Sequence, residues 1–84
     1  MTKDEFMKKL CRLQVFQRMA VGVDNLTFKV DTYVTRDGLA AIEWMLLRSD
    51  EWLKSGTIVE SDDSGKVKEL LAELYMYINK RGWI

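Results

Sequence analysis

The stretch from Leu39 to Leu53 carries apolar side chains on more sides than one covering surface can bury. At the 100° per residue of an α-helix, one apolar stripe contains Leu39, Ile42, Leu46 and Leu53, with Met45 and Trp52 at its flank. A second strip lies almost opposite and contains Ala40, Trp44, Leu47 and Glu51. The fold must therefore cover this segment on two faces or leave an apolar strip exposed.

The residue types of this segment favour a helix. Good helix formers follow Leu39, and the two-residue alternation typical of a strand is lost. Asp37 is placed to be the N-cap, and Gly56 is placed to end the helix, after about Ser55, as a left-handed cap. The alternative is that Asp37 and Gly38 form a hairpin turn.

The first thirty-four residues predict a helix followed by a β-hairpin. Thr2 and Glu5 have the spacing of a capping box, so a helix begins at Lys3, and its apolar stripe leads it to about Gln14. Residues 15–23 and 26–34 then pair through Asp24 and Asn25 as a two-residue loop. The alternative is a helix that continues to Gly22, which would be a left-handed C-cap.

The C-terminal third predicts a short strand and a last helix. Residues 57–60 are long enough for a short strand only, and residues 61–65 supply capping side chains for a helix with a clear apolar stripe. Gly82 would end that helix and return Trp83 onto Ile78. We therefore predict a small α+β domain over residues 1–84, ordered α-β-β-α-(short β)-α, with three helices packed on one face of an antiparallel hairpin.

Composition argues against several classes of function. The 84 residues contain 13 basic and 13 acidic side chains and no histidine, so the usual neutral-pH acid–base group and metal ligand is missing. Cys11 has no imidazole partner and is predicted to be a small helix-packing residue. We predict no enzyme activity, no cofactor, no metal and no small-molecule substrate. Without a long apolar run, a signal peptide or a second cysteine, the expected location is the cytoplasm, away from membranes.

The second apolar strip of residues 39–55 is the first candidate site. If the last helix does not cover Trp44 and Leu47, they form a protein interface rimmed by Arg48 and Glu51, because aromatic anchors within polar rims are typical of binding hot spots. The partner would be another protein or a second copy of the chain. Small chains of this kind are often accessory, regulatory or inhibitory proteins, including phage-encoded inhibitors of host proteins.

The outer face of the predicted hairpin is the second candidate site. It would place Phe16 and Tyr33 beside Arg18 and Lys29, and aromatic rings among basic side chains can stack bases and hold phosphates. The neutral net charge and Asp31 within the patch weaken this hypothesis. A nucleic-acid-associated regulator is therefore the alternative function.

Overall fold

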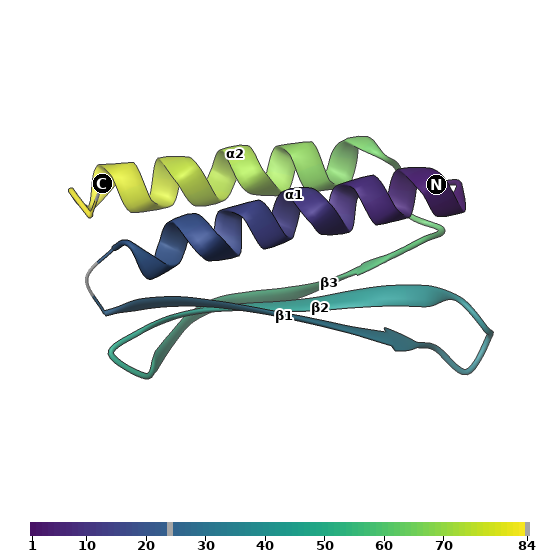
Figure 1. Cartoon of the computed structure of the whole chain (residues 1–84), viewed down its shortest axis with the longest axis horizontal. Coiled ribbons are helices and arrows are strands. Elements are labelled where there is room, and N and C mark those ends of the chain that lie inside the picture. The colour runs from purple at the N-terminus through teal and green to yellow at the C-terminus, as the bar shows by residue number, and fades with distance from the viewer. Residues whose placement is uncertain (24, 84) are drawn as a thin grey trace.

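Two helices lie side by side on one face of a three-stranded antiparallel sheet (Figure 1). The computed structural model describes residues 1–23 and 25–83. The elements, in chain order, are α1 (Lys3–Val21), β1 (Leu26–Val34), β2 (Ala40–Arg48), β3 (Glu51–Val59) and α2 (Gly65–Lys80). The α+β class is confirmed, but the prediction of three helices is wrong, because the described residues form two helices and three strands.

Helix α1 begins where its capping box predicts. The backbone N–H of Glu5 donates to the Thr2 hydroxyl at 3.1 Å, and the Glu5 carboxylate accepts the backbone N–H of Thr2. The helix runs to Val21, so the predicted strand over residues 15–23 is wrong and the longer helix is correct. Gly22 ends it with a right-handed φ of −78°, so the left-handed cap is also wrong. The predicted loop residue Asp24 lies outside the described residues.

The second half of α1 is helical because it continues the buried face of the first half. Phe16 and Ala20 are fully buried in line with Phe6 and Leu13, at spacings of three, four and seven residues. As a consequence, Val15 and Val21 lie on other sides of α1 and are exposed to solvent. The apolar alternation over residues 15–23 that suggested a strand arose because these exposed valines lie between positions of the helix that face the core. Cys11 is exposed, so its predicted packing role is wrong.

Residues 39–55 form two strands, and the predicted helix is wrong. Ser49 and Asp50 have φ values of 52° and 64°, the positive values that a tight two-residue hairpin turn requires. Asp37 belongs to the turn between β1 and β2, where Gly38 has a φ of 81°. The two apolar sides of the segment are therefore the two faces of a sheet, which side chains occupy alternately.

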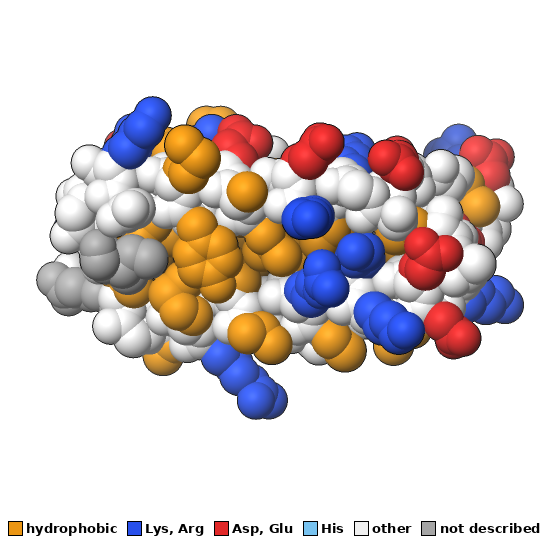
Figure 2. Space-filling view, turned by 90° about the horizontal axis from the view of Figure 1, so that it is seen from above, with side chains coloured by type: hydrophobic (Ala, Val, Ile, Leu, Met, Phe, Trp, Pro, Cys, Tyr) orange, Lys and Arg blue, Asp and Glu red, His pale blue; other side chains and the backbone are white. Residues whose placement is uncertain are grey.

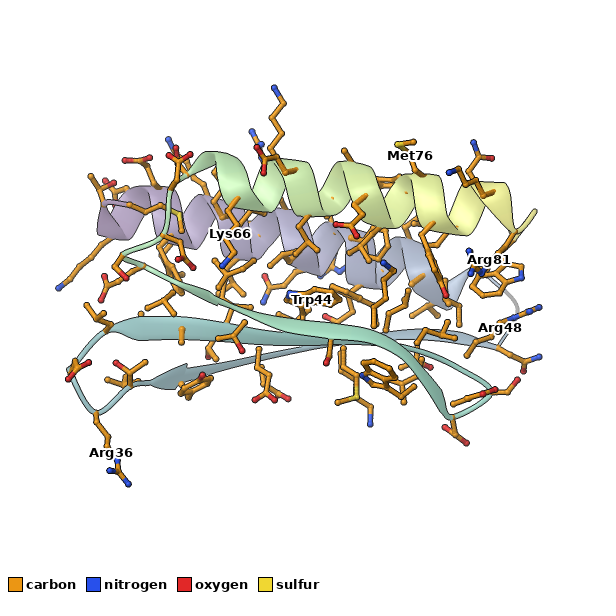
Figure 3. The ribbon with its side chains drawn as sticks, turned by 180° about the vertical axis from the view of Figure 1, so that it is seen from behind. Arg36, Trp44, Arg48, Lys66, Met76 and Arg81 are labelled. Atoms are coloured by element: carbon orange, nitrogen blue, oxygen red, sulfur yellow. The ribbon has the colours of Figure 1, made fainter. Side chains whose placement is uncertain are left out.

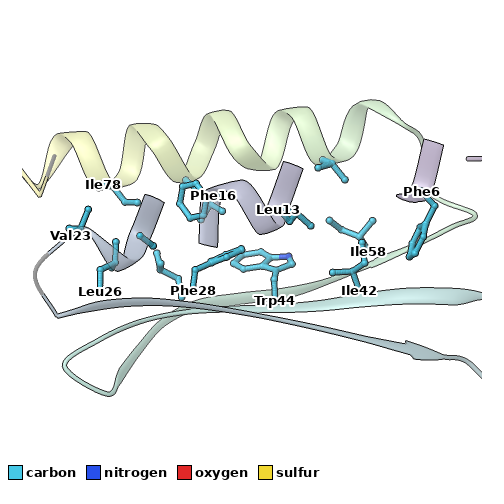
Figure 4. Close-up of a cluster of buried hydrophobic side chains, with 14 residues drawn as sticks. Phe6, Leu13, Phe16, Val23, Leu26, Phe28, Ile42, Trp44, Ile58 and Ile78 are labelled. Carbon is cyan, nitrogen blue, oxygen red and sulfur yellow. The ribbon is translucent and has the colours of Figure 1, made fainter. Parts of the chain in front are cut away.

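Strand β2 is the central strand and gives the sheet its buried face. Ile42, Trp44 and Leu46 point toward the helices and are buried, and Phe28 from β1 and Ile58 from β3 extend this face on either side. Figure 4 shows Phe28, Ile42, Trp44 and Ile58 between the sheet and the helical layer. The core is therefore a single layer between the helices and one side of the sheet.

Gly56 lies in β3 directly opposite Trp44, and the indole occupies the space above it. A Cβ atom built on Gly56 would lie 2.9 Å from Cζ2 of Trp44. The φ of Gly56 is not in the left-handed region, so the predicted role as a helix cap is wrong. This glycine is required instead by the close approach of a large buried ring. Of the short strand predicted over residues 57–60, residues 57–59 are the end of the longer strand β3.

Helix α2 ends as the sequence predicts. Gly82 has a φ of 70°, and its N–H donates to the carbonyl of Asn79, while the N–H of Trp83 donates to the carbonyl of Ile78. These two bonds are the Schellman motif. The start of α2 differs from the prediction, because its N-cap Ser64 makes no side-chain capping bond.

Candidate interaction surfaces

The four residues of the predicted protein interface do not form one strip. Trp44 is only 8% exposed and lies between the sheet and the helices, where its ring stacks on Phe28. Leu47 points to the opposite side of the sheet. Arg48 and Glu51 pair across the end of the β2–β3 hairpin. Figure 3 shows Trp44 on the helix side of the sheet and Arg48 at its far end. The premise of an exposed Trp44 is therefore wrong.

The predicted nucleic-acid face is divided between two sides of the molecule. Phe16 is buried in α1, where its ring makes edge contacts with Phe28 at 4.8 Å and Tyr75 at 5.1 Å. Arg18 is exposed on α1, in the helical layer. Lys29 and Tyr33 lie on β1 and point away from the helices. The structure brings together only Lys29 and Tyr33 of these four residues.

The sheet face opposite the helices is uncovered by any described element, and we call it the outer face. Its rows follow from the strand register, because residues directly opposite each other point to the same side. From one end to the other the rows are Thr27, Leu47 and Trp52; Lys29, Met45 and Ser55; Asp31, Glu43 and Thr57; Tyr33, Ala41 and Val59. Polar side chains fill the middle of this face, and apolar side chains gather at its ends.

The first end of the outer face contains the largest exposed aromatic ring of the sheet. Trp52 is 58% exposed and lies opposite the half-buried Leu47, while Met45 follows in the next row. We call these three residues the Trp52 patch. The bulge at Leu46 and Leu47 lets Trp52 share this face with Leu47. Sequence reasoning placed Trp52 at the flank of a buried helical stripe. The short apolar run from Trp44 to Leu47, followed by Ser49 and Asp50, was the signal that could have indicated a strand with apolar side chains on both faces.

The helical layer carries a basic cluster. Lys8, Lys9 and Arg12 lie within one turn of α1, and Lys68 lies on α2. Both helices run in the same direction (Figure 1), and Lys9 and Lys68 each lie two turns before the contact between Phe16 and Tyr75, so the helix geometry brings them level. In Figure 2, Lys and Arg side chains gather over the middle of this layer, with acidic side chains toward its edges.

None of the four basic residues is neutralised by an ion pair in the described chain. Over residues 1–23 and 25–83, ion pairs join Lys54 to Glu73 and Lys66 to Asp62, each at 3.1 Å. The carboxylate of Glu5, one turn before Lys9, lies near enough for the Lys9 charge to contribute to its lowered pKa.

Arg48 links the β2–β3 hairpin to the residues that follow α2. Its guanidinium lies 4.2 Å from the ring centre of Trp83, a contact that stabilises packing between elements. The guanidinium of Arg81, the C-cap of α2, lies 3.6 Å from the ring centre of Tyr77 in the same helix. Arg48, predicted as an interface rim residue, is engaged within the chain.

Metal-ligating and buried polar groups were also sought among the described residues. Among the residues that the structure describes, no group of three potential metal ligands comes together, and no polar or charged residue is buried. Two acidic groups have a lowered pKa: Glu5, through its hydrogen bonds with Thr2, and Asp62, through the hydrogen bond from the Val59 N–H. Both carboxylates anchor local structure.

Comparisons with known proteins give no relative from which to infer a function. No family model matches the chain, and the searches of curated proteins and of solved structures found no match to it. No helix within the described chain is both long and apolar enough to cross a membrane.

Proposed function

We propose that the protein is a non-enzymatic binding module that acts as an accessory, regulatory or inhibitory protein through its outer sheet face. The observation that carries the proposal is the exposure of Trp52 beside Leu47 and Met45. A core tryptophan buries most of its ring within its own chain, as Trp44 does. Trp52 leaves an apolar surface in water that a partner could cover.

The surroundings of Trp52 resemble the anatomy of a binding hot spot. An aromatic anchor contributes most when neighbouring side chains exclude water around it, and Leu47 and Met45 provide such neighbours. Thr27, Lys29 and Ser55 supply a polar rim on the same face. The partner that fits this surface is a folded protein with an apolar pocket for the indole and polar groups around it.

The proposal is tested with the variants Trp52→Asp and Met76→Asp. Met76 is exposed to nearly the same extent, 59%, but lies on α2, on the helical side of the molecule (Figure 3). Each tagged protein is incubated with lysate of the native host, and the retained proteins are quantified by mass spectrometry. We expect a partner that is retained by the wild type and by Met76→Asp but lost with Trp52→Asp.

Circular dichroism and thermal melting of each variant check that the fold is retained. Trp52→Asp should remain folded because the side chain that it replaces is largely in water. If folded Trp52→Asp retains the same proteins in the same amounts as the wild type, the outer face is not the interface.

A second candidate function is nucleic-acid binding through the basic cluster of the helical layer. Lys9, Arg12 and Lys68 form a local positive surface although the whole chain is neutral. Tyr75, partly exposed and next to this surface, could contribute stacking. This surface differs from the hairpin face inferred from the sequence, but the chemistry of recognition is the same.

Filter binding of single- and double-stranded RNA and DNA at several salt concentrations tests this candidate. Phosphate contacts make binding weaken as salt rises, and the double variant Lys9→Glu, Arg12→Glu should abolish it. The matched control is Lys80→Glu, which changes an exposed lysine at the far end of α2. Binding that is absent, or equal in both variants, would exclude the basic cluster as a nucleic-acid site.

A further inference from the structure

The two edges of the sheet are protected very differently. On β3, the N–H of Val59 donates to the Asp62 carboxylate at 2.8 Å, and the carbonyl of Thr57 accepts from the Lys66 ammonium at 3.4 Å. A bulge also interrupts this strand near Leu53. Bulges and side-chain caps of this kind keep an edge strand from pairing with another chain.

Strand β1 lacks these protections within the described residues. It is nine residues long, pairs with β2 in unbroken register, and no side chain caps its free edge. Two hydrogen bonds next to the ends of the strand show which of its residues face β2. The N–H of Thr35 donates to the carbonyl of Leu39, and the N–H of Ser49 donates to the carbonyl of Asn25. Since antiparallel bonding alternates, the odd-numbered residues face β2, and Phe28, Val30 and Thr32 direct their N–H and C=O groups outward.

Helix α1 leaves the second half of this edge uncovered. The end of α1 lies close to the start of β1, since the N–H of Leu26 donates to the carbonyl of Val23. The other end lies over the far side of the sheet, where the amino group of Met1 donates to the carbonyl of Glu60 at 2.6 Å. The helix therefore crosses the sheet obliquely, and Val34 is 70% exposed.

We propose that two copies of this chain pair antiparallel through their β1 strands, centred on Val30, to form a continuous six-stranded sheet. This centre places Phe28 opposite Thr32 of the second copy and Leu26 opposite Val34. All these residues direct their backbone groups to the free edge, although the N–H of Leu26 already donates to the carbonyl of Val23. The hydrogen-bonding pattern of the sheet therefore continues across the interface except at that donor.

The charges of β1 select this register over its neighbours. Centring on Val30 places Lys29 of each copy directly opposite Asp31 of the other, which gives two opposite-charge pairs on the outer face. Moving the centre by one residue would face Lys29 with Lys29 or Asp31 with Asp31. Within one chain, Asp31 lies opposite Glu43, so the lysine of a second copy would relieve a like-charge contact.

Apolar groups that are exposed in one chain would also meet in the pair. Val34 of one copy would lie beside Leu26 of the other, close to the end of the second copy's α1. Val21 is 80% exposed there, and it lies on the same side of α1 as Met7 and Leu10. Those two residues line an open groove of about 590 Å³ next to the β1 edge. The oblique course of α1 keeps the two α1 helices apart.

Sedimentation velocity over a wide range of protein concentration tests the proposal. The wild type should show a concentration-dependent equilibrium between the 9.8 kDa chain and a species of twice that mass. Lys29→Asp and Asp31→Lys each turn two attractive pairs into two repulsive pairs, so each should weaken association by at least about tenfold. The double variant Lys29→Asp, Asp31→Lys exchanges the charges and should restore it.

Two further variants test whether the charge effect is specific to β1 and whether the free backbone edge of β1 forms the interface. Glu69→Lys makes the same charge change as Asp31→Lys but lies on α2, and it should associate as the wild type does. Thr32→Pro removes an outward N–H that no bond within the chain requires, so it should yield a folded monomer by circular dichroism.

Three results would overturn the proposal: a monomer at every concentration, a dimer unaffected by Lys29→Asp, or a charge-exchanged variant that stays monomeric. A dimer lost with Trp52→Asp but retained with Lys29→Asp would place self-association on the outer face instead. The proposal does not depend on the Trp52 patch binding another protein.

Discussion

The contact between Gly56 and Trp44 gives the sharpest test of the sheet. A Cβ at position 56 would lie 2.9 Å from Cζ2 and 3.0 Å from Cε2 and Nε1 of the indole. Carbon atoms prefer separations of about 3.5–4.0 Å, so either the ring or strand β3 would have to move by about 0.5 Å or more. The buried indole, stacked on Phe28, has little freedom to move.

Gly56→Ala should therefore lower the free energy of unfolding by about 1–3 kcal/mol, the usual cost of overpacking a core. In a domain of this size each kcal/mol lowers the melting temperature by about 4–8 °C. Trp44→Leu, which removes the contacting atoms, is itself destabilising because it leaves a cavity. In that background the added methyl group of Gly56→Ala meets no ring and reduces the entropy of the unfolded chain, so its cost should vanish or reverse.

The assay is urea unfolding of the wild type, the two single variants and the double variant, followed by circular dichroism at low temperature. The expected coupling free energy between positions 44 and 56 is about 1 kcal/mol or more. If the two effects add to within about 0.5 kcal/mol, the ring does not pack on Gly56. A helix over residues 39–55 capped by Gly56 would give that additive result, so the cycle also tests the sheet against the helix.

Three further predictions concern the surface residues Thr2, Asp62 and Cys11. Thr2→Ala removes the capping box of α1 and should cost about 1 kcal/mol of stability, measured by thermal melting. Because the hydrogen bond from Val59 lowers the pKa of folded Asp62 below its unfolded value, the carboxylate stabilises the fold above about pH 4 and loses this effect as the pH falls. The stability difference between the wild type and Asp62→Ala should accordingly narrow from pH 7 to pH 2, and an unchanged difference would contradict the assignment. Cys11 is exposed, so a thiol reagent should label the native protein as fast as the unfolded chain, and strong protection would refute its placement.

The parts of the fold that the sequence predicts correctly are those with local chemical signals. The capping box at Thr2, the left-handed Gly82 and the apolar stripe of the last helix all depend on residues within one or two turns, and each is present in the structure. The strand over residues 26–34 was also predicted with its correct bounds, although with the wrong partner.

The central hairpin could not be predicted from local signals because they favour a helix. Residues 39–48 contain Ala, Leu, Met and Glu, which are good helix formers, and the Ser49–Asp50 turn lacks the glycine that usually marks positive φ. Tertiary packing decides instead: as a strand, β2 buries Ile42, Trp44 and Leu46 together under two helices. The alternation of Ile42 and Trp44 with the polar Glu43 was a weak strand signal.

The error in the candidate site follows from the error in this segment. On a helix, Trp44 and Leu47 share a face, but on a strand residues three apart point to opposite sides. The exposed position of Trp52, on which the proposed interface depends, can be recognised only once β3 is placed beside β2. An interaction surface made by neighbouring strands depends on their register, which no single segment of the sequence specifies.

The proposed β1 dimer and the proposed Trp52 interface together predict how a partner with two binding sites would bind. In the proposed six-stranded sheet, the outer faces of both copies form one surface, and β3 is the outermost strand on each side. Five strand spacings separate the two Trp52 patches by about 24 Å across the sheet, and the antiparallel arrangement offsets them by about 20 Å along it. A partner with two matching sites would then bind with avidity, commonly by a factor of about 10² or more. Asp31→Lys, which removes the same charge pairs without changing the rim of the Trp52 patch, should consequently weaken binding to a two-site partner while leaving the affinity for a single-site partner unchanged. Equal losses for both partners would mean that the charge at position 31 acts directly on the Trp52 patch.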